Sequence, residues 1–295
     1  MSQAIVYMTR EITPESLVTI YEKLGVPLTG KIGIKISTGE PGGHNYLKPE
    51  LIGQLVQKLQ ANIVECNTAY GGRRGDETEH LKAASEHGFT QIATVDIMDG
   101  KGEKEIPVHT GKHLKVDIIG ANFDNYDAFI NLAHFKGHTM GGFGGVLKNQ
   151  SIGFASRAGK AYIHAAGAMR DPNKVWSNLP AQNDFLESMA EAAKAVTDYA
   201  AATGKKILYI NVMNNLSVDC DCDCDPEDPC MRDIGILASL DPVALDQACI
   251  DQIWASTDSG RDHFIERVER QNGRYILPYA EGLGLGSRQY SLEMI

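Results

Sequence analysis

The chain has no long apolar run. No window of its 295 residues reaches the roughly 18 uninterrupted apolar residues that a membrane-spanning helix requires, and the opening MSQAIVYMTREITPES has no signal-peptide pattern. We therefore expect no membrane partner and a cytoplasmic protein, in which thiols stay reduced. Low-complexity linkers and fixed-period repeats are missing as well. A single domain over residues 1–295 is expected, in one lobe or in two divided near 165–185, within RDPNKVWSNLPAQND.

Positive charge is in the minority. The 28 Lys and Arg residues face 38 Asp and Glu residues, so the net charge is −10, which argues against a nucleic-acid partner. Acids are in turn absent from residues 128–170, although the average of 38 in 295 predicts about five or six there. A net-basic segment in an acidic chain indicates a small anionic ligand. Chance clustering around a buried apolar segment is the alternative.

This acid-free segment is rich in glycine, lysine and histidine. Glycine lets backbone N–H groups approach an anion, lysine adds positive charge, and histidine can bind a metal or transfer a proton. The spacing matches neither the P-loop nor the dinucleotide-binding fingerprint. A structural role is the alternative for each single histidine. The candidate catalytic residues are His134, Lys136, His138, Lys148, Lys160 and His164.

Cysteine is concentrated in VDCDCDCDPEDPCMRD, residues 218–233, where it alternates with acids. Neighbouring carboxylates raise the pKa of a thiol and repel one another, and a bound cation would remove both costs. Four thiolates are the usual ligands of tetrahedral zinc or an iron–sulfur cluster. The spacing matches neither zinc-ribbon pairs nor a ferredoxin run. The predicted metal ligands are Cys220, Cys222, Cys224 and Cys230.

Two alternatives remain for the cysteine segment. The alternating acids resemble the start of an EF-hand loop, but Cys224 and Cys230 occupy the positions where that loop needs glycine and glutamate. The segment could also be an exposed acidic loop without a metal. We expect an iron–sulfur cluster or a thiolate-bound transition metal, with zinc as second choice. The remaining cysteines, Cys66 and Cys249, are expected in the core.

Short apolar runs alternate with helical patterns, which predicts an α/β fold with a mainly parallel sheet flanked by helices. The predicted strands are KIGIKIS, NIVECN, QIATVDI, VDIIGA, AFINLAHF and KKILYINV. Helices are expected from Pro49, from about Thr78 to His87, over FLESMAEAAKAVTDYAAATG, and from Pro242 with Asp241 as N-cap.

Ligands of such sheets gather beyond the carboxyl ends of the strands. Loops 38–48, 69–75 and 214–230 follow predicted strands. If AFINLAHF and KKILYINV are neighbours, the histidine and cysteine segments should meet in a cleft of about 300–1,000 Å³. The candidate ligand-binding residues at this edge are Lys35, His44, Arg73, Arg74 and Asn149.

The stretch FINLAHFKGHTMGGFGGVLKNQSIGFASRAGKAYIH resembles the central motif of the domain-of-unknown-function 362 family, often labelled iron–sulfur-centre proteins. The likeness continues through NVMNNLSVDCDC, DIGILASLDPVALDQACID and EGLGLGSRQYSL, and back to KIGIKISTGEPGGHNYLKPELI. Many members carry a ferredoxin-type insertion, which this chain lacks. A fainter likeness, in the Gly/His/Lys loops only, is to nickel-pincer lactate racemases.

The family's chemistry is largely undefined, so the residues and the resemblance together imply a class of function. We expect a metal- or iron–sulfur-binding protein with a small anionic ligand, acting in redox or proton-transfer chemistry if it is an enzyme. The alternative is a non-catalytic electron or metal carrier with a redox partner, or an anion-binding module. A deep pocket joining the two segments would favour an enzyme. The oligomeric state is left open.

Overall fold

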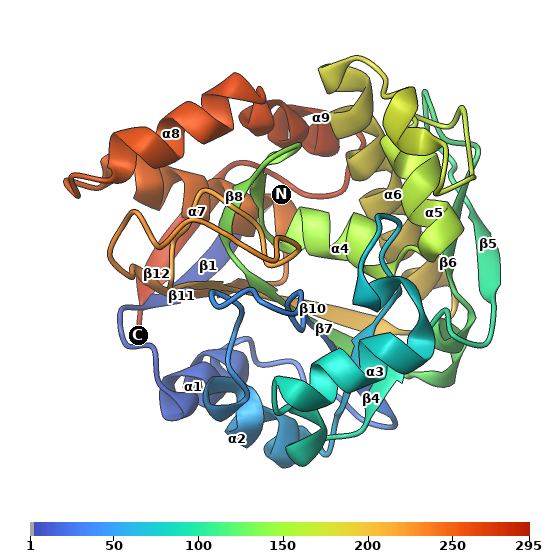
Figure 1. Cartoon of the computed structure of the whole chain (residues 1–295). Coiled ribbons are helices and arrows are strands. Elements are labelled where there is room, and N and C mark those ends of the chain that lie inside the picture. The colour runs from blue at the N-terminus through green and yellow to red at the C-terminus, as the bar shows by residue number, and fades with distance from the viewer. Residues whose placement is uncertain (1–2) are drawn as a thin grey trace.

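The computed structural model describes residues 3–295, and a mixed sheet of eight strands runs through this part of the chain (Figure 1). The strand order is β12-β1-β11-β10-β7-β2-β3-β4. Strand β11 is antiparallel to both of its neighbours, and the other adjacent pairs are parallel. The predicted α/β class with a mainly parallel sheet is confirmed. The strands are β1 (Ala4–Thr9), β2 (Ile32–Lys35), β3 (Asn62–Glu65), β4 (Val95–Ile97), β7 (Ala128–His134), β10 (Lys206–Met213), β11 (Gly235–Ser239) and β12 (Tyr290–Met294).

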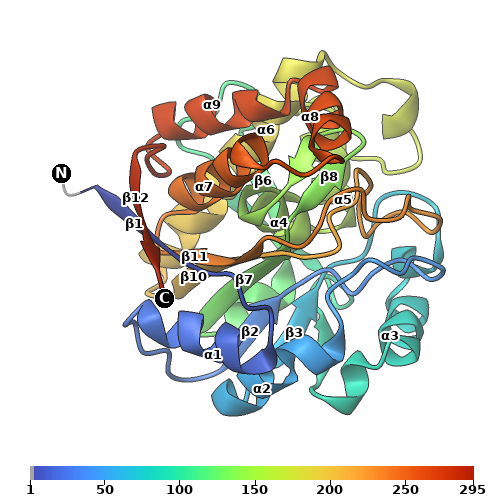
Figure 2. The ribbon, with the colours of Figure 1, turned by 90° about the vertical axis from the view of Figure 1, so that its left-hand side faces the viewer.

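Helices cover both faces of the sheet (Figure 2). One core, with Ile34, Ile130 and Ile210 from the sheet, packs against α1, α2 and α3. A larger and a smaller core on the other face pack against the remaining helices. The helices are α1 (Pro14–Lys23), α2 (Pro49–Leu59), α3 (Glu77–Glu86), α4 (Val146–Phe154), α5 (Arg157–His164), α6 (Gln182–Ala202), α7 (Pro242–Ala255), α8 (Arg261–Arg270) and α9 (Ile276–Gly282).

Local sequence signals place several helix ends. The Asp241 side chain accepts hydrogen bonds from the backbone of Val243 and Ala244, and so caps α7 as predicted. Helix α3 ends before Gly88, whose φ of 87° lies in the left-handed region.

Two small antiparallel sheets lie outside the main one. They are formed by β5 (Glu103–Pro107) with β6 (Val116–Gly120), and by β8 (Lys136–His138) with β9 (Gly142–Gly144). VDIIGA forms a strand, β6, as predicted, but this strand pairs with β5 and not with the main sheet. Its Ile118 and Ile119 are buried in the cores on the sheet face that α4 to α9 cover, and an apolar run does not specify which sheet its strand joins.

The pairing of β7 with β10 determines where the two unusual segments lie. These strands are parallel neighbours, with Ala128 opposite Lys206 and His134 opposite Val212. Their carboxyl ends therefore deliver the histidine and cysteine segments to the same edge of the sheet. The sheet also joins strands from both sides of residues 165–185. In the described part of the chain, no helix has the length and apolar character needed to span a membrane.

Candidate metal and anion site

A cavity of about 610 Å³ opens at this edge of the sheet. Its walls come from the loops after β2 and β3, from β8 and the turn after it, from α4 and α5, and from the cysteine segment. The predicted meeting of the histidine and cysteine segments in one cleft is thus observed. The predicted site residues that line the cavity are Lys35, Arg73, Arg74, His138, Lys148, Asn149, Lys160, His164, Cys220, Cys222 and Cys224.

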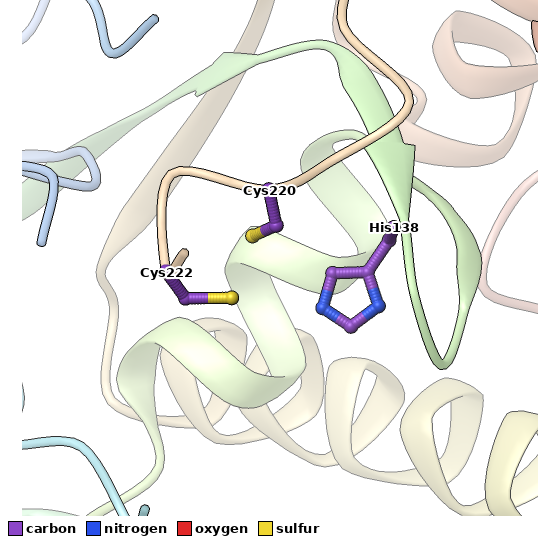
Figure 3. Close-up of side chains that lie close together, drawn as sticks. All are labelled: His138, Cys220 and Cys222. Carbon is purple, nitrogen blue, oxygen red and sulfur yellow. The ribbon is translucent and has the colours of Figure 1, made fainter. Parts of the chain in front are cut away.

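One group in this cavity has the composition of a metal site. Potential ligand atoms of His138, Cys220 and Cys222 all lie within 4.8 Å of one another, around a common space (Figure 3). His138 ends β8, whereas the cysteines come from the loop that follows β10. Cys220 is 3% exposed and Cys222 is partly buried. The group is therefore assembled from distant parts of the chain and is largely shielded from solvent.

The orientation of His138 is fixed by the turn that follows it. Its Nδ1 accepts hydrogen bonds from the backbone N–H groups of Met140 and Gly141, at 3.1 and 2.8 Å. Burial, followed by the charge of Lys148, lowers the pKa of His138, so the ring is neutral near pH 7. With Nδ1 accepting, the ring proton is on Nε2. Nε2 must give up this proton to bind a metal; otherwise it donates a hydrogen bond to a thiolate.

Of the two thiols, that of Cys220 loses its proton more readily. Its pKa lies well below the ordinary value, first because the Cys222 thiol donates to its sulfur, and then because Lys148 and His138 are close; burial opposes both. Lys148 Nζ lies 3.2 Å from Cys220 Sγ. The same hydrogen bond, together with burial, raises the pKa of Cys222. In the absence of metal, this pair holds one thiolate and one thiol.

The donor types suit a thiophilic ion. Two thiolates and an imidazole are ligands found at zinc and other transition-metal sites with an open position. A cluster held by four cysteines would also require Cys224 and Cys230. Cys224 is exposed at the cavity, and the Sγ of Cys230 donates to the carbonyl of Leu216 at 3.3 Å, outside the group.

Asp221 ties the cysteine segment to the end of β7 and to β8. It is 4% exposed and receives hydrogen bonds from His134 Nδ1 at 2.8 Å and Lys136 Nζ at 2.7 Å. His134 and Lys136 do not line the cavity. In the structure, both side chains hold the Asp221 carboxylate by hydrogen bonds. Their catalytic role stays a prediction.

Two further elements hold the cysteine segment. Arg267 of α8 donates to the Val218 carbonyl at 2.7 Å. The loop after β2 packs on the segment so closely that a Cβ on Gly42 would lie 2.7 Å from the Cys224 carbonyl oxygen. Gly42 also has φ of 97°, which favours glycine.

The wall formed by the ends of β2 and β3 and the loops that follow them contains a buried ion-pair network. Lys35 Nζ lies 3.3 Å from Glu65, Arg74 Nε lies 2.8 Å from Glu40, and Arg74 Nη1 lies 3.4 Å from Glu65. Burial would raise the pKa of Glu65, but Lys35, His80 and Arg74 lower it well below its ordinary value. The positive charges of Lys35 and Arg74 are thus already compensated by protein carboxylates.

His164 is a neutral side chain in the cavity wall. Its Nδ1 donates to the Lys160 carbonyl at 2.7 Å, which leaves Nε2 as an acceptor. Burial is the main cause that lowers the pKa of His164 to about 4, and the positive charges of Lys148 and Lys160 add to it. The ring stacks on Phe185.

Other predicted ligand-binding residues have protein partners. His44 pairs with Asp228 at 3.1 Å on the surface and does not line the cavity. Arg73 is at the cavity but pairs with Glu79 and Glu86. Asn149 donates to the Lys35 carbonyl at 3.0 Å.

Sequence reasoning missed Glu65, Thr68, Tyr70 and Trp176, all of which line the cavity. Glu65 ends β3 and the next two belong to the loop that follows it, so the rule that ligands bind beyond strand ends could have found them. Trp176 lies in the loop between α5 and α6, and no sequence signal indicated it. Cys66 is buried as expected, and its Sγ donates to the Phe154 carbonyl, although the residue also borders the cavity.

The family model described as "Domain of unknown function (DUF362)" matches residues 32–251. The chain belongs to this family, as the sequence motifs predicted. No curated protein matches the chain significantly.

Two solved structures are similar to the chain at low identity. The lactate racemase apoprotein from Thermoanaerobacterium thermosaccharolyticum has a TM-score of 0.44 and 12% identity, over 85% of this chain and 57% of that one. A protein from Thermotoga maritima has a TM-score of 0.44 and 12% identity, over 88% of this chain and 56% of that one. The chain therefore spans somewhat more than half the length of either protein.

Proposed function

We propose that this protein binds a thiophilic metal ion through Cys220 and Cys222, assisted by His138, and that a small anionic ligand enters the cavity beside it. A single cavity that joins this Cys/His group to Lys148, Lys160 and His164 is the observation that carries the proposal. An enzyme of redox or proton-transfer chemistry fits this arrangement better than a carrier, because a carrier has no need of an internal cavity lined by basic groups.

The groups that line the cavity would have different roles in this function. A metal ion held by the thiolates would act as a Lewis acid or a redox centre. Lys148 balances the thiolate charge of Cys220, at 3.2 Å. His164 offers a neutral ring nitrogen that can accept a hydrogen bond from a bound ligand. Glu65 and Glu40 hold Lys35 and Arg74 in place at the wall.

Metal analysis of anaerobically purified protein tests the proposal. We expect about one metal ion per chain, and loss of most of it in the double variant Cys220→Ser/Cys222→Ser. Cys230→Ser is the matched control, because Cys230 belongs to the same segment but lies outside the group. Full retention of metal in the double variant would contradict the proposal.

A visible spectrum of the same sample separates the candidate cofactors. An iron–sulfur cluster absorbs in the visible range, whereas bound zinc does not. A redox-active chromophore that transfers electrons to a docking protein without consuming a small ligand would favour the alternative, an electron carrier.

A further inference from the structure

Lys160 differs from the other buried basic residues at the cavity. It is 6% exposed, and its Nζ donates only to backbone carbonyls, those of Ala155 at 2.6 Å and Cys66 at 3.5 Å. Among the described residues, no carboxylate lies within ion-pair distance of it. Lys35 and Arg74, by contrast, contact Glu65 and Glu40. An ammonium group without an opposite charge is costly to bury.

Thr68 borders the same cavity and also lacks a partner. It is 5% exposed, and its Oγ1 is buried without a hydrogen bond in the described part of the chain. Buried hydroxyl groups are normally paired, so such an atom at a cavity wall indicates a missing ligand or water. Thr68 lies two residues beyond Cys66, whose carbonyl accepts from Lys160. The third N–H of the Lys160 ammonium and the Thr68 hydroxyl are therefore two donors without a partner among the described residues, both next to the chain at Cys66.

The remaining wall indicates the rest of the ligand. Met140, Ile152 and Trp176 contribute apolar surface to the cavity. The two donors suit the two oxygens of a carboxylate. The arginines at this cavity, Arg73 and Arg74, are already paired with glutamates and are not free for the several contacts that a phosphate group needs.

We infer that Lys160 and Thr68 form a carboxylate subsite and that the ligand is a short-chain carboxylate, with its apolar body against Met140, Ile152 and Trp176. This inference rests on the proposed function, because it places the ligand in the cavity that the Cys/His group shares. It gives Lys160 a carboxylate at hydrogen-bond distance, where residues 3–295 offer it only the carbonyls of Ala155 and Cys66. Lys148 is left to balance the Cys220 thiolate.

Calorimetric titration of metal-loaded protein with acetate, butyrate and inorganic phosphate, at constant pH and ionic strength, tests the inference. We expect saturable binding of a carboxylate and weaker binding of phosphate. Lys160→Gln should weaken carboxylate binding by about tenfold or more, and Thr68→Val by about fivefold, as expected for a charged and a neutral hydrogen bond. The control Lys101→Gln removes the same charge from an exposed position and should change nothing.

Metal content, measured in each variant, separates the two claims. A wild-type protein without metal would contradict the proposed function. Metal-loaded protein that binds neither carboxylate, or that prefers phosphate, overturns the inference alone. Unchanged carboxylate affinity in both variants does the same. Should Lys160→Gln fail to fold, Thr68→Val decides the question.

Discussion

At the scale of single residues, two buried aspartates, Asp221 and Asp117, have pKa values shifted in opposite directions. Burial would raise the pKa of Asp221, but Lys136 and His134 outweigh it and lower the pKa to about 2. Asp117 is fully buried, and within residues 3–295 the Ile118 N–H is the only hydrogen-bond donor to its side chain. Burial therefore raises the pKa of Asp117 to about 7. The cysteine segment is anchored by a compensated carboxylate, whereas the Ile118 N–H and the charge of Lys160 do not offset the burial of Asp117.

We expect Asp117→Asn to flatten the pH dependence of stability. Because the folded-state pKa of Asp117 exceeds its unfolded value, the folded protein retains a proton that the unfolded chain releases, and stability falls as the pH rises from about 4 to about 7. The variant should be more stable than the wild type at pH 8, by up to about 4 kcal/mol, and similar at pH 4. Urea unfolding at both pH values measures this. An unchanged slope would show that Asp117 is compensated.

His138→Asn tests the imidazole of the metal group. Asparagine can still accept the backbone N–H groups of Met140 and Gly141 but cannot reach the thiolates. Metal affinity should fall about 10- to 100-fold, whether His138 is a ligand or a hydrogen-bond donor to one. Competition with a chelator measures the affinity, and His44→Asn, at the surface, is the control. Wild-type affinity in the His138 variant would remove this residue from the site.

At the scale of elements, the site depends on segments that contribute no ligand. Strand β8 supplies Lys136, helix α8 supplies Arg267, and the loop after β2 supplies the close contact at Gly42. Lys136 contacts the Asp221 side chain, whereas Arg267 and Gly42 contact the backbone of the cysteine segment. Together they hold this segment at the sheet edge. A substitution in these supports should therefore reduce metal binding without removing a donor atom.

Asp221→Asn is the most direct test of this support. It leaves Lys136 buried without an opposite charge, so we expect a loss of about 3 kcal/mol of unfolding free energy together with reduced metal content. Asp223→Asn is the matched control in the same segment, because Asp223 is only partly buried and its side chain accepts from the Asp225 backbone alone. Chemical unfolding and metal analysis give both readouts. Equal effects of the two substitutions would mean that the Asp221 contacts do not hold the site.

The sequence predicted elements better than side-chain directions. Apolar periodicity and caps located β7, β10 and the main helices, and strand-end logic located the shared edge. Whether His134 or His138 faces the cavity could not be predicted, because residues four apart share a face in a continuous strand. The chain instead leaves the main sheet after His134, which contacts Asp221, and His138 ends β8 of a second sheet, at the metal group. The compensation of Lys35 and Arg74 by Glu65 and Glu40 likewise needed the folded chain.

At the scale of the whole molecule, an acidic protein presents a locally basic cavity. The net charge is −10, yet Lys148 and Lys160 face the cavity with only a thiolate and carbonyl groups as partners. The parallel sheet brings this acid-free segment and the acidic cysteine segment to one edge. The central claim is that a metal ion and a carboxylate bind side by side in this space.

Reciprocal linkage tests that claim most directly. Metal affinity is measured with and without saturating short-chain carboxylate, and carboxylate affinity with and without metal. Two ligands in one cavity should alter each other's affinity by the same factor, in the range of about 5- to 150-fold, and Lys160→Gln should abolish the effect. Two affinities that do not depend on the other ligand would contradict the account.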